Sequence, residues 1–290
     1  MKNCTRNVRW SVVMLAISLV ASAQETSKLS FKFTTLNVKG SQETDIYGIG
    51  NSGAVVGSYT DKNGIEHGLM LARGKATNID DPNGTGGTFC YNINASGAIV
   101  GYYLNSSGAA QGFLYKGGKF SEVGPAGTGS YALGINSKGV ITGYYYDSSG
   151  LEHGYVLQGK TYTTLDVPSA TGSGAWGIND KGLISLFWFD SSGSYAGALY
   201  DGKKYTTIKV PGATQSIAHS INNNGDVVFA WVDSGGNYHG ALRMGGKYYK
   251  FNDPKGSSNT RPDGINDQRT VAGRFLATGK STYQGFSATY

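Results

Sequence analysis

The feature that most constrains this chain is an internal repeat of about 43 residues. A Gly-Ile-Asn-like element recurs six times, and its isoleucines are Ile49, Ile93, Ile135, Ile178, Ile221 and Ile265. Successive isoleucines lie 44, 42, 43, 43 and 44 residues apart, so the spacing is nearly constant. Self-similarity at a period in this range predicts an architecture of stacked or ring-forming repeats.

Each repeat contains four strand-like segments, which we call a to d. In the third repeat segment a ends at Asn136, and segments b, c and d cover residues 140–146, 153–157 and 162–167. Turns rich in Gly and Asp separate them. The chain has 45 Gly and 20 Tyr among 290 residues, and both types are unfavourable in helix interiors. No unit shows a helical pattern, and each is too long for one β-helix coil. The repeat therefore predicts a propeller blade.

The two ends of the repeat region predict a closed ring. Residues 31–38 resemble segment d although no a, b or c precedes them, and the sixth repeat ends after segment c, at residues 285–290. A strand from the N-terminal part would then complete the last blade and remove an exposed sheet edge. We predict an all-β protein, a six-bladed β-propeller with four-stranded blades, over residues 31–290.

The first 23 residues have the pattern of a secretory signal peptide. Lys2, Arg6 and Arg9 precede an apolar stretch at residues 10–20, and residues 21–23 read Ala-Ser-Ala. We expect cleavage after Ala23, a short linker at residues 24–30, and a secreted or periplasmic protein; an uncleaved anchor is the alternative. The apolar stretch is too short to span a bilayer, so no membrane span is expected in the mature chain.

Removal of this segment changes the charge and the cysteine count. The formal net charge falls from +6 to +3, because three of the 25 basic residues leave. No Lys/Arg cluster stands in the remaining sequence, so we expect no nucleic-acid partner. Cys4 leaves as well, and Cys90 alone allows no internal disulfide. Cys90 is expected to be a small buried hydrophobe in a monomer stabilised by packing.

A second repeated element points to a family. It stands as His67-Gly-Leu, Gln111-Gly-Phe, His153-Gly-Tyr, His239-Gly-Ala and Gln284-Gly-Phe, and it accompanies the Gly-Ile-Asn-x-x-Gly and Val-Gly-x-Tyr elements. Over residues 31–290 the sequence resembles the HAF family of bacterial extracellular repeats. It departs from that pattern by using Gly where Ala is usual, and Ala196 where His would stand. The resemblance implies export and repeat architecture, and it implies neither an enzyme activity nor a site.

One position of segment b is aromatic in every repeat. Its residues are Tyr59, Tyr103, Tyr145, Trp188, Trp231 and Phe275. Positions alike in all six copies serve what every blade needs, which is packing between twisted sheets. We therefore predict that these rings belong to the core; a ligand-stacking ring is the alternative.

Two repeated motifs suggest metal ions, but structural roles fit them better. His67, His153 and His239 share one position of segment c in alternate blades. A third strand from the axis would hold them too far apart for zinc bonds of about 2.0–2.1 Å. We expect each to bond to a neighbouring Asp-x-x-Gly turn or an adjacent strand. Those turns, at residues 61–64, 147–150, 190–193 and 233–236, offer one carboxylate each, too few for calcium. No metal and no cofactor is predicted.

The position before each Gly-Ile element varies between repeats. It holds Tyr47, Tyr91, Leu133, Trp176, His219 and Asp263, and Glu43, Asp45 and Arg261 are near it in sequence. The d-to-a loops, which share one face of the ring with the b-to-c turns, should bring these residues around the opening. Aromatic and polar side chains on loops of a rigid scaffold suit a ligand. The predicted ligand-binding residues are Tyr47, Tyr91, Trp176, His219, Asp263 and Arg261; drift with aromatics packed under the loops is the alternative.

These residues predict a non-catalytic binding or interaction module for an extracellular glycan or protein. A polysaccharide-active enzyme, lyase or hydrolase, is the alternative, with His219, Asp263 and Asp45 performing acid–base chemistry. An enzyme would need His219 and Asp263 in one open pocket. A structural surface or adhesion component is the second alternative. The sequence contains no nucleophile elbow, phosphate loop, cysteine pair or zinc signature.

Overall fold

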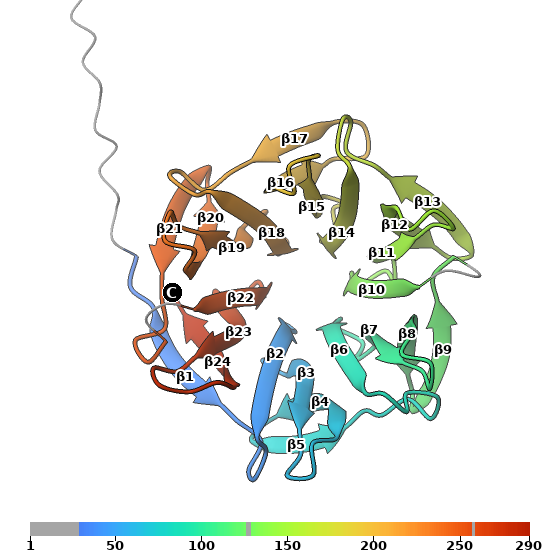
Figure 1. Cartoon of the computed structure of the whole chain (residues 1–290), viewed down its shortest axis with the longest axis vertical. Helices are drawn as coiled ribbons and strands as arrows, with labels where there is room; N and C mark the ends of the chain where they lie inside the picture. The colour runs from blue at the N-terminus through green and yellow to red at the C-terminus, as the bar shows by residue number, and fades with distance from the viewer. Residues whose placement is uncertain (1–28, 126–128, 257–258) are drawn as a thin grey trace, which may run out of the picture.

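A computed structural model of the chain describes residues 29–125, 129–256 and 259–290. Six antiparallel sheets of four strands each form a ring around a central axis (Figure 1). These residues contain no helix, and so none that is long and apolar enough to cross a bilayer. The predicted six-bladed β-propeller is confirmed. The predicted signal peptide and most of the linker lie outside the described residues.

Each blade runs outward from an innermost strand a to an outermost strand d. Blade 1 contains β2 (Glu43–Ile49), β3 (Val55–Thr60), β4 (Glu66–Ala72) and β5 (Lys75–Asn78); blade 2 contains β6 (Thr88–Ile93), β7 (Ile99–Leu104), β8 (Ala110–Lys116) and β9 (Lys119–Val123). Blade 3 contains β10 (Ser130–Ile135), β11 (Ile141–Tyr146), β12 (Glu152–Gln158) and β13 (Thr161–Leu165); blade 4 contains β14 (Gly172–Ile178), β15 (Ile184–Phe189), β16 (Tyr195–Tyr200) and β17 (Tyr205–Ile208). Blade 5 contains β18 (Gln215–Ile221), β19 (Val227–Val232), β20 (Tyr238–Met244) and β21 (Lys247–Phe251). Blade 6 contains β22 (Thr260–Ile265), β23 (Thr270–Leu276), β24 (Tyr283–Thr289) and, as its outer strand, β1 (Lys32–Leu36).

The ring closes through strand β1, as predicted. It pairs antiparallel with β24, and its register runs from Lys32 opposite Thr289 to Leu36 opposite Gly285. Figure 1 shows this blue strand along the outer edge of the red C-terminal blade. The ring of Phe33 lies 5.5 Å from that of Phe286. The two ends of the described chain thus share one sheet and one core.

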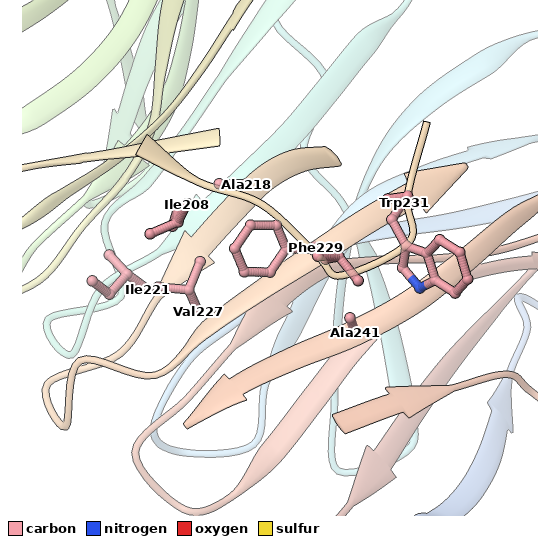
Figure 2. Packing of buried hydrophobic residues seen from close by; sticks show 9 residues of the cluster. Ile208, Ala218, Ile221, Val227, Phe229, Trp231 and Ala241 are labelled. Carbon is pink, nitrogen blue, oxygen red and sulfur yellow. The ribbon is translucent and has the colours of Figure 1, made fainter. Parts of the chain in front are cut away.

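Apolar side chains between neighbouring blades make up most of the core. Figure 2 shows the cluster between blades 4 and 5, where Phe229 and Trp231 of β19 pack with Ile208 and Ala218. Every residue of β19 is buried, because this strand has a sheet neighbour on each side and a blade on each face. This double burial explains why the b segments are mostly apolar or aromatic.

The glycine of the His-Gly element stands where two blades approach closely. A Cβ added at Gly154 would lie 2.7 Å from the carbonyl oxygen of Leu165 and 3.2 Å from the amide of Ala175 in the next blade. At Gly285 it would lie 2.5 Å from the Ile46 side chain of blade 1. An alanine would clash at these positions, which accounts for the departure from the His-Ala-Phe pattern.

The aromatic position of segment b packs in the core, as predicted. Phe275, Tyr103 and Trp231 are buried, and the other three rings are partly buried. The hydroxyl of Tyr103 donates to Glu122 Oε1 at 3.1 Å, on strand d of the same blade. These rings lie across their own blades and do not form a circle around the axis.

The three repeated histidines bond within their own blades, as predicted. His153 Nδ1 lies 3.0 Å from Asp166, and its Nε2 lies 3.4 Å from Asp147 in the b-to-c turn. Burial alone would lower the pKa of His153, but these two carboxylates raise it above its ordinary value. Asp147 also accepts the amides of the turn, from Ser149 and Leu151. Among the described residues, no group of three or more His, Cys, Asp or Glu could hold a metal ion.

Candidate functional site

The central channel has two different ends. We call the end formed by the a-to-b turns the collar end, and the end formed by the d-to-a connections and b-to-c turns the variable end. At the collar end an asparagine side chain of one blade donates to a backbone carbonyl of the next, at 3.0–3.2 Å. The donors are Asn94, Asn136, Asn179, Asn222 and Asn266. These bonds connect every neighbouring pair of blades except blades 1 and 2, where Gly50 replaces the asparagine.

A second circle of hydrogen bonds lies beside the first. The amides of Ser137, Asp180, Asn223 and Asp267 donate to Asp180, Asn223, Asp267 and Asn51 of the following blade, at 2.8–2.9 Å. With the six repeat isoleucines, these polar groups line a recess at the collar end. Since the groups bond to each other in a repeated pattern, this end is a scaffold that joins blades.

At the variable end, a β-bulge in each innermost strand determines where the variable residues lie. The pairing register shifts at the residue before the Gly-Ile element, for example between Ile46 and Gly48. A bulge leaves one residue outside the ladder and re-aims its side chain. The re-aimed residues of neighbouring blades therefore meet around the axis.

The structure brings five of the predicted site residues into one series. The rings of Tyr47 and Tyr91 stack at 4.5 Å, and the edge of Trp176 follows Tyr91 at 5.9 Å. Trp176 stacks on His219 at 4.0 Å, and His219 Nδ1 lies 3.1 Å from Asp263 Oδ1. The series runs from blade 1 to blade 6 and passes over blade 3, where Leu133 is buried.

A buried charged group completes this circle, and we call it the charged half. It comprises Asp45, His219, Asp263 and Arg274. Arg274 Nε lies 3.4 Å from Asp45, its Nη1 lies 3.7 Å from Asp263, and its guanidinium lies 4.9 Å from the Tyr47 ring centre. Asp263 is 1% exposed, and neither of its carboxylate oxygens has a hydrogen bond with good geometry. Its charge is balanced by ion pairs alone.

Burial and charge pairing compete in the charged half, with opposite outcomes at Asp45 and Arg274. Burial raises the pKa of Asp45 to about 7, although the positive charge of Arg274 opposes the shift. Burial alone would lower the pKa of Arg274, yet Asp263, Tyr47 and Asp45 raise it above its ordinary value. Arg274 therefore stays charged, while Asp45 titrates near neutrality.

Partly exposed aromatic rings form the other half of this end, which we call the aromatic arc. It consists of Phe89, Tyr91, Tyr102, Tyr131, Tyr144, Trp176 and Phe187. Ring centres of neighbours lie 4.4–5.9 Å apart, as between Tyr131 and Tyr144 at 4.4 Å. All but Phe187 keep part of their surface in solvent. Burial raises the pKa of Tyr102 to about 12, so its hydroxyl stays protonated and able to donate.

A half-buried carboxylate borders the aromatic arc. Glu152 accepts the hydroxyl of Tyr146 through Oε2 at 3.0 Å, and its Oε1 has no hydrogen-bond partner. Burial raises the pKa of Glu152 to about 7. Glu152 therefore places a buried carboxylate oxygen without a hydrogen-bond partner beside the rings.

Arg261 does not join the other predicted site residues. Its guanidinium lies 3.7 Å from the ring centre of Tyr238, and its Nε donates to Asn259 at 3.1 Å. It belongs to strand β22 itself, opposite Arg274, and its guanidinium lies 5.7 Å from the ring centre of Tyr283. Glu43, also near the opening in sequence, accepts the amide of Tyr283.

Sequence reasoning missed Arg274 and three tyrosines of the arc. Arg274, Tyr102 and Tyr144 occupy a second variable position, in segment b, which holds Ser58, Tyr102, Tyr144, Phe187, Ala230 and Arg274, whereas Tyr131 lies on strand a. The residues of this second position pair with a third variable position on strand a, for example Asp45 with Ser58 and Tyr131 with Tyr144. The same comparison of six repeats, extended to all strand positions, would have found them.

His219 and Asp263 are in contact, but they are not open to solvent. His219 is 4% exposed, its ring is covered by Trp176, and its Nδ1 donates to the carbonyl of Pro262 at 2.8 Å. General acid–base chemistry needs the catalytic group within hydrogen-bond reach of the substrate. The geometry makes His219 and Asp263 part of the floor beneath the aromatic rings.

Comparisons with known proteins agree with the architecture. No protein-family model matches the sequence, and no curated protein matches it. Among solved structures, a mutant of the lectin from Aleuria aurantia in complex with Fucα1-6GlcNAc superposes with a TM-score of 0.54 at 17% identity, covering 88% of this chain and 93% of the lectin. The SapL1 lectin in complex with α-methyl fucoside gives 0.56 at 12% identity, with 84% and 92% covered. A putative TolB from Agrobacterium tumefaciens gives 0.57 at 14%, with 71% and 79% covered. At these identities the likeness establishes the six-bladed fold alone.

Proposed function

We propose that this protein is a secreted, non-catalytic module that binds a glycan at the variable end of its ring. The observation that carries the proposal is the aromatic arc, a continuous row of partly exposed rings beside polar groups. The apolar face of a sugar packs on such rings, and its hydroxyls bond to groups at their edges. Tyr102, whose hydroxyl stays protonated, can donate to such a sugar hydroxyl.

The neighbouring folds support a sugar as the ligand class. Two of the six-bladed structures similar to this chain are lectins described with fucose-containing ligands. The resemblance to HAF repeats and the signal-peptide pattern support an extracellular setting, where glycans are abundant. The burial of His219 and Asp263 favours binding over catalysis. The aromatic rings are concentrated at one end of the ring of blades. This favours a sugar-binding site over a purely structural surface component.

A glycan array tests the proposal. The mature chain should bind a defined set of glycans, and Tyr131→Ala, which removes the centre of the arc, should weaken binding by about fivefold or more, since stacking on one ring contributes roughly 1–3 kcal/mol by analogy with base stacking. Trp176→Ala should weaken it as well. Tyr162→Ala is the matched control, because this ring is 39% exposed on the outer strand of blade 3, away from the opening.

Three results would contradict the proposal. The first is the absence of any bound glycan on an array that captures a reference lectin. The second is equal binding by the wild type and both arc variants. The third is release of new reducing ends from a bound polysaccharide, which would make the protein an enzyme. Circular dichroism of each variant separates a lost site from a lost fold.

A further inference from the structure

The two ends of the ring carry opposite charge, a property that no stretch of the sequence shows. At the collar end, where the c-to-d turns join the a-to-b turns, the exposed cations are Lys32, Arg73, Lys75, Lys116, Lys119, Lys138, Lys160, Lys181, Lys203, Lys204, Lys247 and Arg269. They come from all six blades. The repeat encodes this arrangement, because a basic residue follows or flanks the Gly of each c-to-d turn, as in Arg73-Gly-Lys75.

Few carboxylates offset these cations. The acidic residues at this end are Asp180, Asp201, Asp226 and Asp267. Asp180 and Asp267 accept interblade hydrogen bonds in the collar, and Asp226 is 6% exposed. Only Asp201 is fully exposed. In the part of the chain that the structure describes, none of the twelve cations forms an ion pair.

At the variable end the balance is reversed. Its acidic residues are Glu43, Asp45, Asp61, Glu66, Asp80, Asp81, Glu122, Asp147, Glu152, Asp166, Asp190, Asp233, Asp253 and Asp263, against Lys39, Lys62, Lys209, Lys250, Lys255, Arg261, Arg274 and Lys280. Strands of six or seven residues separate the two ends by roughly 20 Å. The Debye length is about 8 Å at physiological ionic strength, so a partner at one end is screened from the other. Each end therefore presents its own charge.

We propose that the collar end docks on an anionic lipid bilayer. The shape of the charge distribution selects this partner. The cations lie around one end of the ring and are spread over six blades. A flat anionic surface can contact all of them at once, whereas a linear polyanion would contact only a few at a time. They are mostly lysines, and in the part of the chain that the structure describes none of them lies over an aromatic ring, which suits phosphate headgroups. Lysines near an anionic leaflet each add to binding.

This inference goes beyond the proposed glycan site and gives it an orientation. A ring lying with its collar end on a bilayer points the variable end, with the aromatic arc, directly away from the lipid. The acidic residues of the variable end oppose the reverse orientation. The ring would then hold a glycan above a membrane surface without inserting any segment into it.

Vesicle co-sedimentation tests the docking with the mature chain. Vesicles containing phosphatidylglycerol should bind the protein at low salt, vesicles of phosphatidylcholine alone should not, and about 0.5 M salt should abolish binding. A collar-end variant carrying Lys75→Glu, Lys119→Glu, Lys160→Glu and Lys204→Glu should lose at least about tenfold in affinity. A control carrying Lys39→Glu, Lys62→Glu, Lys209→Glu and Lys280→Glu has the same net charge but changes the variable end, and it should lose less than about twofold.

The matched pair keeps the test decisive. Equal losses in both variants would mean that net charge alone drives adsorption, and the proposal would fail. It would also fail if wild-type protein bound soluble heparin but not anionic vesicles, because the partner would then be a linear polyanion. All eight substituted lysines are exposed, and melting curves confirm that each variant is folded. Glycan binding is scored separately on the array, so failure of one proposal leaves the other standing.

Discussion

The two ends of the central channel are built from the same six repeated strands, but they differ in how their side chains vary between blades. At the collar end the same residue type, asparagine, serves five of the six blades in the same bond. At the variable end the equivalent bulge residues are two tyrosines, a leucine, a tryptophan, a histidine and an aspartate. A residue type that is repeated in the blades serves the packing and bonding that every blade needs. A position that varies between blades can contribute different side chains to the one opening of the ring.

The ends also differ in how well their polar groups are satisfied. Each collar asparagine that bridges two blades also accepts backbone amides within its own turn, as Asn179 does from Lys181 and Leu183. At the variable end Asp263 has only ion pairs, and Glu152 has one oxygen without a partner. Unsatisfied buried polar groups reduce stability, and proteins retain such costs mainly at functional sites.

The comparison is tested most strongly at Arg274. We expect Arg274→Met to destabilise the fold by about 3–5 kcal/mol, because it leaves Asp45 and Asp263 buried without their cation. Methionine keeps most of the side-chain volume, so the loss reports charge and not packing. Urea unfolding followed by tryptophan fluorescence measures the change.

A double variant shows whether the charge balance is the cause. Arg274→Met combined with Asp263→Asn should recover a large part of the lost stability, since it removes the uncompensated carboxylate. If the stability loss of the double variant equalled the sum of the losses of Arg274→Met and Asp263→Asn, the two side chains would not be coupled. The ion pairs would then not be what Arg274 contributes to stability.

At the collar end the largest effect is expected from Asn222. Asn222→Ala should cost about 2–3 kcal/mol, because a buried side chain loses its bond to the Asn266 carbonyl and leaves the amides of Asn224 and Asp226 without their acceptor. Thermal unfolding measures this loss, and glycan binding should be unchanged.

Asn105 supplies a matched control for the collar. It accepts two turn amides in the same way, from Ser107 and Ala109, but it lies in an exposed b-to-c turn and bridges no blades. Asn105→Ala should cost less than about 1 kcal/mol. Equal losses at the two positions would show that the interblade bond contributes nothing, and the contrast between scaffold and site would lose its energetic basis.

The charged half also predicts a dependence of stability on pH. The pKa of Asp45 is about 7 in the fold against an ordinary value of 3.8, so the folded state holds an extra proton between about pH 4 and 7. Stability should therefore fall as the pH rises through this window. Glu152 contributes in the same direction, since its pKa is also raised to about 7.

Single variants divide this dependence between the two carboxylates. Asp45→Asn should remove roughly 1–2 kcal/mol of the decline, and Glu152→Gln should remove a further part. Denaturation midpoints measured from pH 4 to 8 provide the curves. A wild-type profile that is flat, or that rises over this range, would mean that neither carboxylate is protonated in the fold near neutrality.

The fold was predictable because its signal is repeated. A residue such as Ile135 has five counterparts at nearly constant spacing, so its place in a blade follows from the period. Closure followed from the extra d segment, since β1 and β24 must pair for the edge to disappear. The bonds of the repeated histidines, such as His153 with Asp147, followed from turn chemistry within one hairpin.

The site was only partly predictable. The bulge position identified Tyr47, Tyr91 and Trp176, because the six copies could be compared there. Sequence could not show that Arg274 reaches two carboxylates from other strands, or that Arg261 lies over Tyr238 instead. Those outcomes depend on which neighbouring blade a side chain leans toward, and this is set by packing between copies that are far apart in the chain.

The smallest expected effect concerns the one missing link of the collar. Gly50 occupies the asparagine position in blade 1, and a Cβ there would meet the Ile93 side chain at 3.3 Å, a contact that a small shift of a methyl group relieves. Gly50→Asn should supply an acceptor for the amides of Ser52 and Ala54 and a donor toward blade 2, as the other five asparagines do. The added hydrogen bonds should make it about 0.5–1 kcal/mol more stable than Gly50→Ala. Gly50→Ala separates the effect of the amide from that of a less flexible unfolded chain, which alone contributes about 0.4–1 kcal/mol where the native backbone accepts a side chain. If Gly50→Asn is no more stable than Gly50→Ala in thermal unfolding, the opening between blades 1 and 2 does not accept the bond, and blade 1 differs from the other copies at the collar end as well as at the variable end.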